Sequence, residues 1–179
     1  MHILIIILEI IGVLLVCLFI AAAFSSEGYV IESEQVINKP QAEVFSYIRH
    51  LKNQENYNKW VLMDPNVRKK FTGTDGTVGF HYAWDSDNNQ VGQGEQTITA
   101  LTDKRVDYAL LFIKPFSGKA ESYLDTESLP GGQTNVIWVF RGKRTFMMKV
   151  MHLAFNLKKT LKKDLQTSLN NLKRILEQT

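Results

Sequence analysis

Apolar residues run almost unbroken through the first part of the chain, whereas a helix of a soluble domain carries an apolar stripe and a polar face. The stretch from Ile3 to Phe24 is apolar except for Glu9 and Gly12. As a helix, its 22 residues would span about 33 Å, close to the hydrocarbon thickness of a bilayer. The pattern predicts a transmembrane anchor. Glu9 lies toward one end, where it can approach the interface or take up a proton.

A cleaved signal peptide is the alternative, because Ala21-Ala22-Ala23 offers the small residues of a cleavage site. The apolar stretch exceeds the usual length of about 7–15 residues and no Lys or Arg precedes it, which favours a retained single-pass anchor. We therefore divide the chain into an anchor with its linker (1–26) and a folded domain (27–179). Acidic residues follow the anchor and count little in the positive-inside rule, and the expected orientation places the N-terminus inside and the domain outside the cytoplasm.

Beyond the linker, short runs with alternating apolar residues are separated by Gly, Pro, Asn and Asp, which is typical of strands joined by turns. Seven strands are expected in all, and the six between Asn66 and Gly142 follow one another with short turns, which indicates an antiparallel meander. The seven strands are expected at Tyr29–Ile37, Val67–Thr72, Val78–Trp84, Val91–Leu101, Val106–Ile113, Lys119–Glu127 and Thr134–Arg141. The glycines of Gly92-Gln93-Gly94 predict a bend or bulge.

Helices are expected in two places. After the first strand, Asn38 is a plausible cap for a helix over Gln41–Arg49, followed by a second helical stretch to Lys59 and an irregular link from Trp60 to Pro65. At the end of the chain, leucines recur at three- and four-residue steps between Met147 and Glu177, which predicts one long helix with an apolar stripe.

This order of elements, and several short motifs, resemble the START/polyketide-cyclase (SRPBCC) superfamily over about Tyr29 to Glu177. The run from Asn38 to Phe45 resembles the entry of that family into its first helix, and Gly76, Val78 and Gly79 its glycine-bearing hairpin. The run from Gly131 to Trp138 resembles its final strand. The resemblance implies an α+β helix-grip fold, in which a seven-stranded curved antiparallel sheet wraps around the long C-terminal helix.

In such proteins an apolar cavity between sheet and helix typically holds a lipid, polyketide, sterol or similar molecule. Members include carriers, cyclases, aromatases, hydroxylase subunits and chaperone activators, so the fold does not determine the function. The membrane-anchored binding or transport of a small hydrophobic or amphipathic ligand is our first hypothesis. A cyclase or dehydratase acting on an aromatic or polyketide-like substrate, and a protein-interaction module of the chaperone-activator type, are the alternatives.

Aromatic and apolar residues at two-residue spacing share one face of their strand, so they can line such a cavity or form ordinary core. Methionine suits an adaptable apolar pocket, and several cluster at the start of the last helix. Arg141 or Tyr82 could anchor a polar end of the ligand. The candidate ligand-binding residues are Phe80, Tyr82, Trp84, Leu110, Phe112, Trp138, Phe140, Met147, Met148, Met151, Phe155 and Arg141.

The composition of the chain narrows the kinds of site that it can form. A net charge of +3 gives no indication of nucleic-acid binding, and Cys17 alone excludes an intramolecular disulfide. The four histidines form no metal-binding pair, although His152 could face the cavity. No catalytic motif is present, so we expect no catalytic residues, metal or cofactor. The expected partners are a small hydrophobic ligand and the membrane, and the sequence names no protein partner. The lysines of the last helix indicate a solvated face or contact with anionic lipid.

Overall fold

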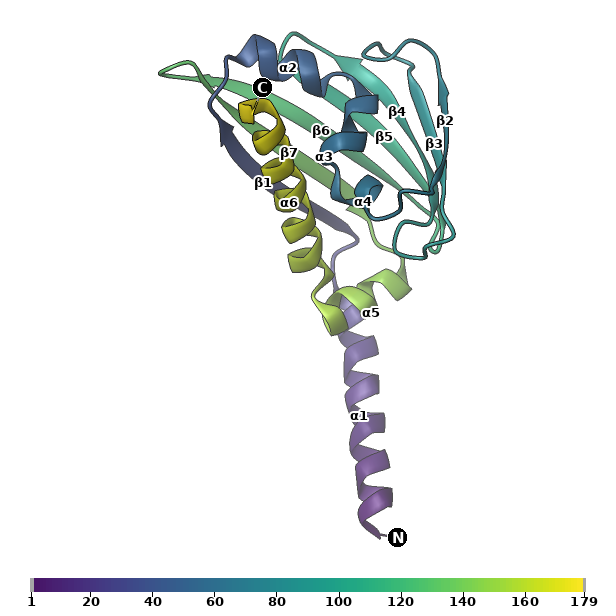
Figure 1. Ribbon diagram of the computed structural model, residues 1–179. Coiled ribbons are helices and arrows are strands. Elements are labelled where there is room, and N and C mark those ends of the chain that lie inside the picture. Colours follow the sequence, from purple (N-terminus) through teal and green to yellow (C-terminus); the bar gives the residue numbers. More distant parts are fainter. Residues whose placement is uncertain (1, 179) are drawn as a thin grey trace.

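The computed structural model of the protein describes residues 2–178 (Figure 1). Within them, seven strands form one antiparallel sheet in the order β1-β7-β6-β5-β4-β3-β2, and the long helix α6 packs on it. The strands are β1 (Gly28–Ile37), β2 (Arg68–Thr72), β3 (His81–Asp85), β4 (Gln93–Leu101), β5 (Arg105–Lys114), β6 (Gly118–Leu129) and β7 (Gln133–Lys143). The α+β helix-grip fold expected from the sequence is confirmed.

Two strands begin later than the alternation predicted. The third was expected from Val78 and the fourth from Val91, but β3 starts at His81 and β4 at Gln93. Gly79 and Gly92 have φ of 89° and 65°, a left-handed backbone that ends the turns and that other residues rarely adopt. The expected bulge is confirmed by a register shift between Gln93 and Gly94.

The helical segment after β1 consists of more pieces than expected and extends further along the chain. Helix α2 (Gln41–Ile48) has Pro40 at its N-cap position rather than Asn38, and η1 (Leu51–Asn53) leads directly into α3 (Gln54–Tyr57). A further helical turn, α4 (Lys59–Leu62), occupies the region that was expected to be irregular. The cause is Asn58, whose side chain accepts a hydrogen bond from the backbone N–H of Trp60 at 3.1 Å and caps the turn.

The C-terminal helix is broken, which corrects the expectation of one helix from Met147 to Glu177. Helix α5 (Phe146–Phe155) and helix α6 (Leu157–Gln178) meet at Asn156, which has a left-handed backbone with φ 48° and ψ 46°. Asn tolerates this conformation better than most residues, because its short side chain hydrogen-bonds locally. The break lets α5 turn away from the axis of α6 and lie across the end of the domain (Figure 1).

Helix α6 contributes its leucine stripe to the core, and polar side chains along its edge bond to α3 and α4. Leu165, Leu169, Leu172 and Leu176 are buried. On the edge, the Ser168 hydroxyl accepts a hydrogen bond from the backbone N–H of Lys59 at 2.9 Å. The Asn171 amide donates to the carbonyl of Tyr57 at 3.2 Å, and Lys59 pairs with Asp164. These contacts hold α3 and α4 over one side of α6 while the sheet covers the other.

Helix α1 (His2–Phe24) extends away from the domain, and only Leu18 and Ala22 among its side chains are not fully exposed (Figure 1). It is the one helix in residues 2–178 that is long and apolar enough to cross a membrane. Its last turns contact α5, where the rings of Phe19 and Phe146 stack with centroids 6.1 Å apart. The structure therefore has an exposed apolar helix whose C-terminal turns contact the domain.

Candidate ligand-binding cavity

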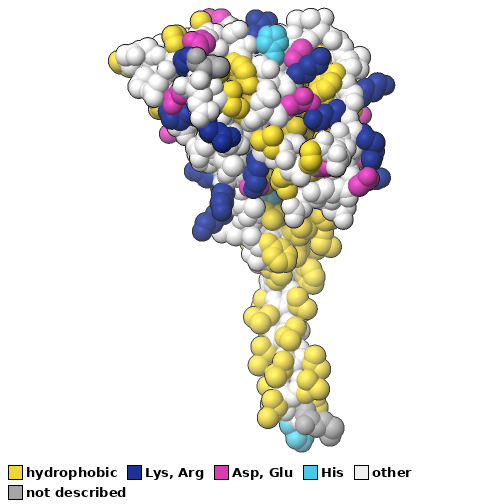
Figure 2. Space-filling model, viewed as in Figure 1, with side chains coloured by type: hydrophobic (Ala, Val, Ile, Leu, Met, Phe, Trp, Pro, Cys, Tyr) yellow, Lys and Arg dark blue, Asp and Glu magenta, His cyan; other side chains and the backbone are white. Residues whose placement is uncertain are grey.

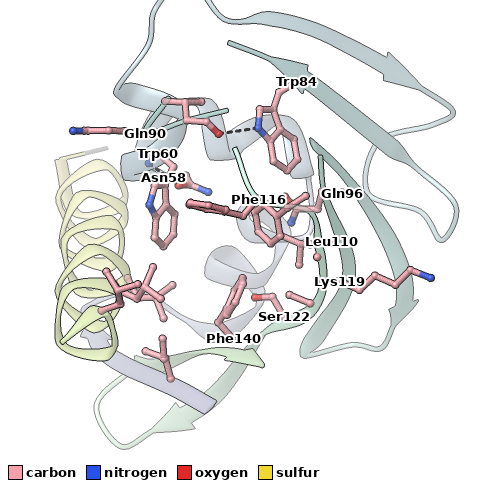
Figure 3. A pocket seen from close by; sticks show the side chains of 18 of the residues that line it. Asn58, Trp60, Trp84, Gln90, Gln96, Leu110, Phe116, Lys119, Ser122 and Phe140 are labelled. Atoms are coloured by element: carbon pink, nitrogen blue, oxygen red, sulfur yellow. Dashed lines mark hydrogen bonds between the residues drawn. The ribbon is translucent and has the colours of Figure 1, made fainter. Parts of the chain in front are cut away.

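A cavity of about 340 Å³ lies between the sheet, α4, α5 and the first half of α6 (Figure 3). It occupies one end of the sheet, which the register defines through the pairs Gly28 with Lys143, and Phe112 with Gly118. This is the end from which α1 emerges (Figure 1). The opposite end is filled by packed side chains of the core, among them Ile37, Phe45 and Leu176. The cavity therefore lies at the α1 end of the fold.

Most of the cavity wall is apolar and aromatic. The sheet contributes large side chains that alternate along β3, β5 and β7, and Trp60 and Val61 of α4 face them. All three tryptophans of the chain, Trp60, Trp84 and Trp138, line this one space. Of the candidate residues from the sequence, the structure brings together Tyr82, Trp84, Leu110, Phe112, Trp138, Phe140 and Met148.

The other candidates lie elsewhere. Phe80 is buried in the core, with its ring stacked on Phe71 at a centroid distance of 6.0 Å. Met147 and Phe155 are exposed on α5, and Met151 is half-buried outside the cavity. Arg141 is exposed, and its guanidinium lies 5.4 Å from the ring centre of Tyr123. The break at Asn156 explains why Met147, Met151 and Phe155 lie outside the cavity, because it turns α5 so that only part of one face reaches that space.

The cavity also contains residues that the sequence did not mark as candidates. Gln54 comes from the helical segment after β1. Asn58 and Trp60 come from the same segment, and Phe116 comes from the turn between β5 and β6 (Figure 3). Gln96 is a polar residue on the buried face of β4. No local pattern in the sequence marks these positions, which come together through the tertiary fold.

Hydrogen bonds satisfy the polar groups of the sheet wall. The indole N–H of Trp138 donates to the Ser122 hydroxyl at 2.9 Å, and that hydroxyl donates to the carbonyl of Val139 at 2.8 Å. The indole N–H of Trp84 donates to the carbonyl of Val91 at 3.2 Å (Figure 3). Burial raises the pKa of Tyr82 to about 12, so its hydroxyl is neutral at physiological pH. The wall therefore presents little unsatisfied polarity to a ligand.

Two lining residues are exceptions. The amide Nε2 of Gln54 is buried without a hydrogen-bond partner among the described residues. His152 reaches the cavity from α5, is buried, and its Nε2 has no hydrogen-bond partner there either. Its ring lies 5.1 Å from that of Tyr29. Burial lowers the pKa of His152, and the positive charge of Arg144 lowers it further. The imidazole is therefore neutral at pH 7, and Nε2 can donate or accept one hydrogen bond inside a largely apolar space.

Comparison with known proteins supports the fold. No protein-family model matches the sequence, and no curated protein matches it. The structure is similar to protein CV1439 from Chromobacterium violaceum, with a TM-score of 0.57, 15% identity, and coverage of 83% of this chain and 96% of that one. It is similar to protein MLL2253 from Mesorhizobium loti (TM-score 0.61, 15% identity, 84% and 98% covered) and to Ara h 8.0201 (0.57, 12%, 85% and 99%).

These matches define the class of structure to which the chain conforms. Each covers almost the whole of the other protein, so the likeness concerns a complete domain and not a shared fragment. The structural resemblance to SRPBCC proteins that the motifs indicated is thereby confirmed at the level of the fold.

Proposed function

We propose that this protein binds a small hydrophobic or amphipathic molecule in the cavity between sheet and helix, while α1 anchors it in a membrane. The observation that carries the proposal is the cavity itself, about 340 Å³ in volume and walled by aromatic and aliphatic side chains. Small-molecule sites are typically of roughly 300–1,000 Å³ and largely apolar, with a few placed polar groups. Removal of the ligand's apolar surface from water would provide most of the affinity.

His152 gives the proposed ligand one polar contact. Because its Nε2 is neutral, buried and unpaired, a ligand hydroxyl, carbonyl or carboxyl group would satisfy it. A fully apolar ligand would leave this nitrogen unsatisfied, at a cost of about 1–3 kcal/mol. The proposal therefore favours an amphipathic molecule with one small polar group, such as a single-chain lipid or a polyketide-like compound.

Anchoring would place this cavity beside a store of apolar molecules. Helix α1 has 23 residues and a length of about 35 Å, enough to cross the hydrocarbon core of a bilayer. We propose residues 1–26 as anchor and linker and 27–179 as the binding domain, on the outer side of the membrane. Tethering raises the effective concentration of a binding site close to its ligand source.

The test uses the full chain in lipid nanodiscs and cis-parinaric acid as the probe. Every tryptophan of the chain lines the cavity, so energy transfer from tryptophan to the probe reports binding there. We expect saturable transfer at about one probe per chain, above the signal from probe dissolved in the disc lipid. Native mass spectrometry of the released protein should show a co-purified small molecule. Transfer that rises without saturation, together with consistently empty protein, would contradict the proposal.

A further inference from the structure

The polar and apolar faces of helix α5 are arranged in the opposite way to those of a surface helix in a soluble protein. Its two polar residues, Lys149 and His152, are only 9% and 8% exposed and face the protein. Its apolar residues Met147 and Phe155 are 54% and 70% exposed, and Phe146 and Leu153 are exposed beside them. In water, a surface helix turns its polar face outward and its apolar face inward. The outward face of α5 therefore fits an apolar environment better than water.

The position of α5 relative to α1 is consistent with such an environment. The Phe146 ring stacks on Phe19, which precedes the end of α1 by five residues, or about 7.5 Å along the helix axis. Ala22, on the next turn, is fully buried. If α1 crosses a bilayer, the start of α5 lies at the depth of its last turns. That depth is the boundary between acyl chains and headgroups.

Other exposed apolar residues continue this surface. Ile113 and Phe116, at the end of β5 and in the turn that follows, are exposed at the same end of the sheet. Figure 2 shows apolar side chains gathered where α1 joins the domain, with charged side chains spread over the rest of the face in view. Exposed cations lie close in sequence to these apolar residues, at Lys114, Lys143, Lys158 and Lys159. Apolar residues bordered by lysines are typical of a surface that lies in a membrane interface.

The same surface forms the edge of the cavity. Four residues from this surface line the cavity. They are Met148 and His152 of α5, Leu157 at the start of α6, and Phe116 in the turn after β5. The residues on the outside of this edge are the exposed apolar ones described above. A molecule dissolved in the outer part of a bilayer would thus meet the edge of the cavity without crossing open water.

We propose that α5 and the turn after β5 lie in the interfacial layer of the bilayer that α1 crosses, so that the cavity opens onto that layer. The partner of this surface is the lipid bilayer, because the surface continues the membrane-spanning helix and carries lysines at its border. The inference rests on the anchoring part of the proposed function. It adds that the ligand is taken from the membrane and not from the aqueous phase.

The test measures depth in the membrane at single sites of the full chain. The protein is reconstituted into vesicles of phosphatidylcholine with one-fifth phosphatidylglycerol, and an environment-sensitive fluorophore is attached to one cysteine at a time. The native Cys17 reports on α1. In a Cys17→Ser background, Met147→Cys reports on α5. Val78→Cys is the matched control, since Val78 is 59% exposed and lies in the loop between β2 and β3, at the opposite end of the sheet.

We expect quenching by spin-labelled lipid at Cys17 and at Met147→Cys, and none at Val78→Cys. Iodide in the water should quench the Met147→Cys label about five-fold less than the Val78→Cys label, since the interface excludes the anion. A Cys17 label in lipid beside a Met147→Cys label open to iodide overturns this inference and leaves the anchor intact. A Cys17 label in water overturns the anchor as well. A Met147→Cys label shielded from both quenchers also overturns the inference, because protein, either a second copy or another partner, then covers α5 in place of lipid.

Discussion

Filling the cavity from the sheet side tests whether it is the binding site. Ala120 of β6 lines the cavity beside Leu110, its register partner on the neighbouring strand β5. In Ala120→Phe the new ring would occupy the space proposed for the ligand. Phe carries six more carbon atoms than Ala, and each ligand methylene kept out of an apolar site forfeits about 0.8 kcal/mol. Displacement of about three methylenes would cost ~2.4 kcal/mol, which is a roughly 60-fold weaker affinity.

The matched control changes the same residue type on the other face of the sheet. Ala109 of β5 is exposed and lies outside the cavity. In Ala109→Phe, the added ring meets solvent, so the dissociation constant for cis-parinaric acid should stay within about two-fold of the wild-type value. Both variants are titrated in nanodiscs by energy transfer from tryptophan, and far-ultraviolet circular dichroism verifies that each is folded. A folded Ala120→Phe variant that binds as tightly as Ala109→Phe would refute the assignment of the site.

Three further predictions concern stability, measured by urea unfolding of the full chain in detergent. Leu169→Ala should cost about 2–5 kcal/mol, because Leu169 is fully buried, whereas the exposed Lys163→Ala should stay within about 0.5 kcal/mol of wild type. Gly94→Ala should cost about 1–3 kcal/mol and shift the tryptophan emission, because a Cβ would collide with the Trp84 ring and lie 2.6 Å from the carbonyl oxygen of Leu111. Stability should fall as the pH drops below 6.5, since the unfolded chain takes up a proton at His152 before the folded protein, whose pKa there is lowered. His152→Gln should reduce this fall, and an unchanged pH profile would exclude His152 as its source.

The strands and the leucine stripe of α6 could be predicted because they depend on local periodicity. Alternation along β7 places Val136 and Trp138 on the buried face, as the sequence indicated. The cavity wall from the sheet followed from the same rule, since Leu110, Phe112 and Phe140 lie on the inner faces of their strands. Such patterns state which face of a strand is buried. They do not state whether a neighbouring side chain or an empty space lies opposite.

The helical side of the cavity depends on contacts that are distant in sequence. Gln54 and Asn58 reach the cavity because α6 clamps α3 and α4 through Ser168 and Asn171, which are more than 100 positions away. Phe80 illustrates the converse. It follows the same alternation as Tyr82, but its position beside the turn after β2 stacks it on Phe71 in the core. Its distance from the α1 end of the sheet, and not its strand face, keeps it out of the cavity.

Helix α5 shows how one backbone conformation decides the meaning of a sequence pattern. On an unbroken helix, the methionines near its start would follow the leucine stripe toward the sheet, and Lys149 would lie among the solvated lysines. The left-handed Asn156 turns the segment, so that Lys149 and His152, three residues apart, face the protein together. The same turn exposes Met147 and Phe155. A composition that predicts a cavity wall on a straight helix thus forms an outward apolar face on a broken one. Because this face adjoins α1, the proposed anchoring would place it against the bilayer, and the cavity beside it would then open toward the lipid.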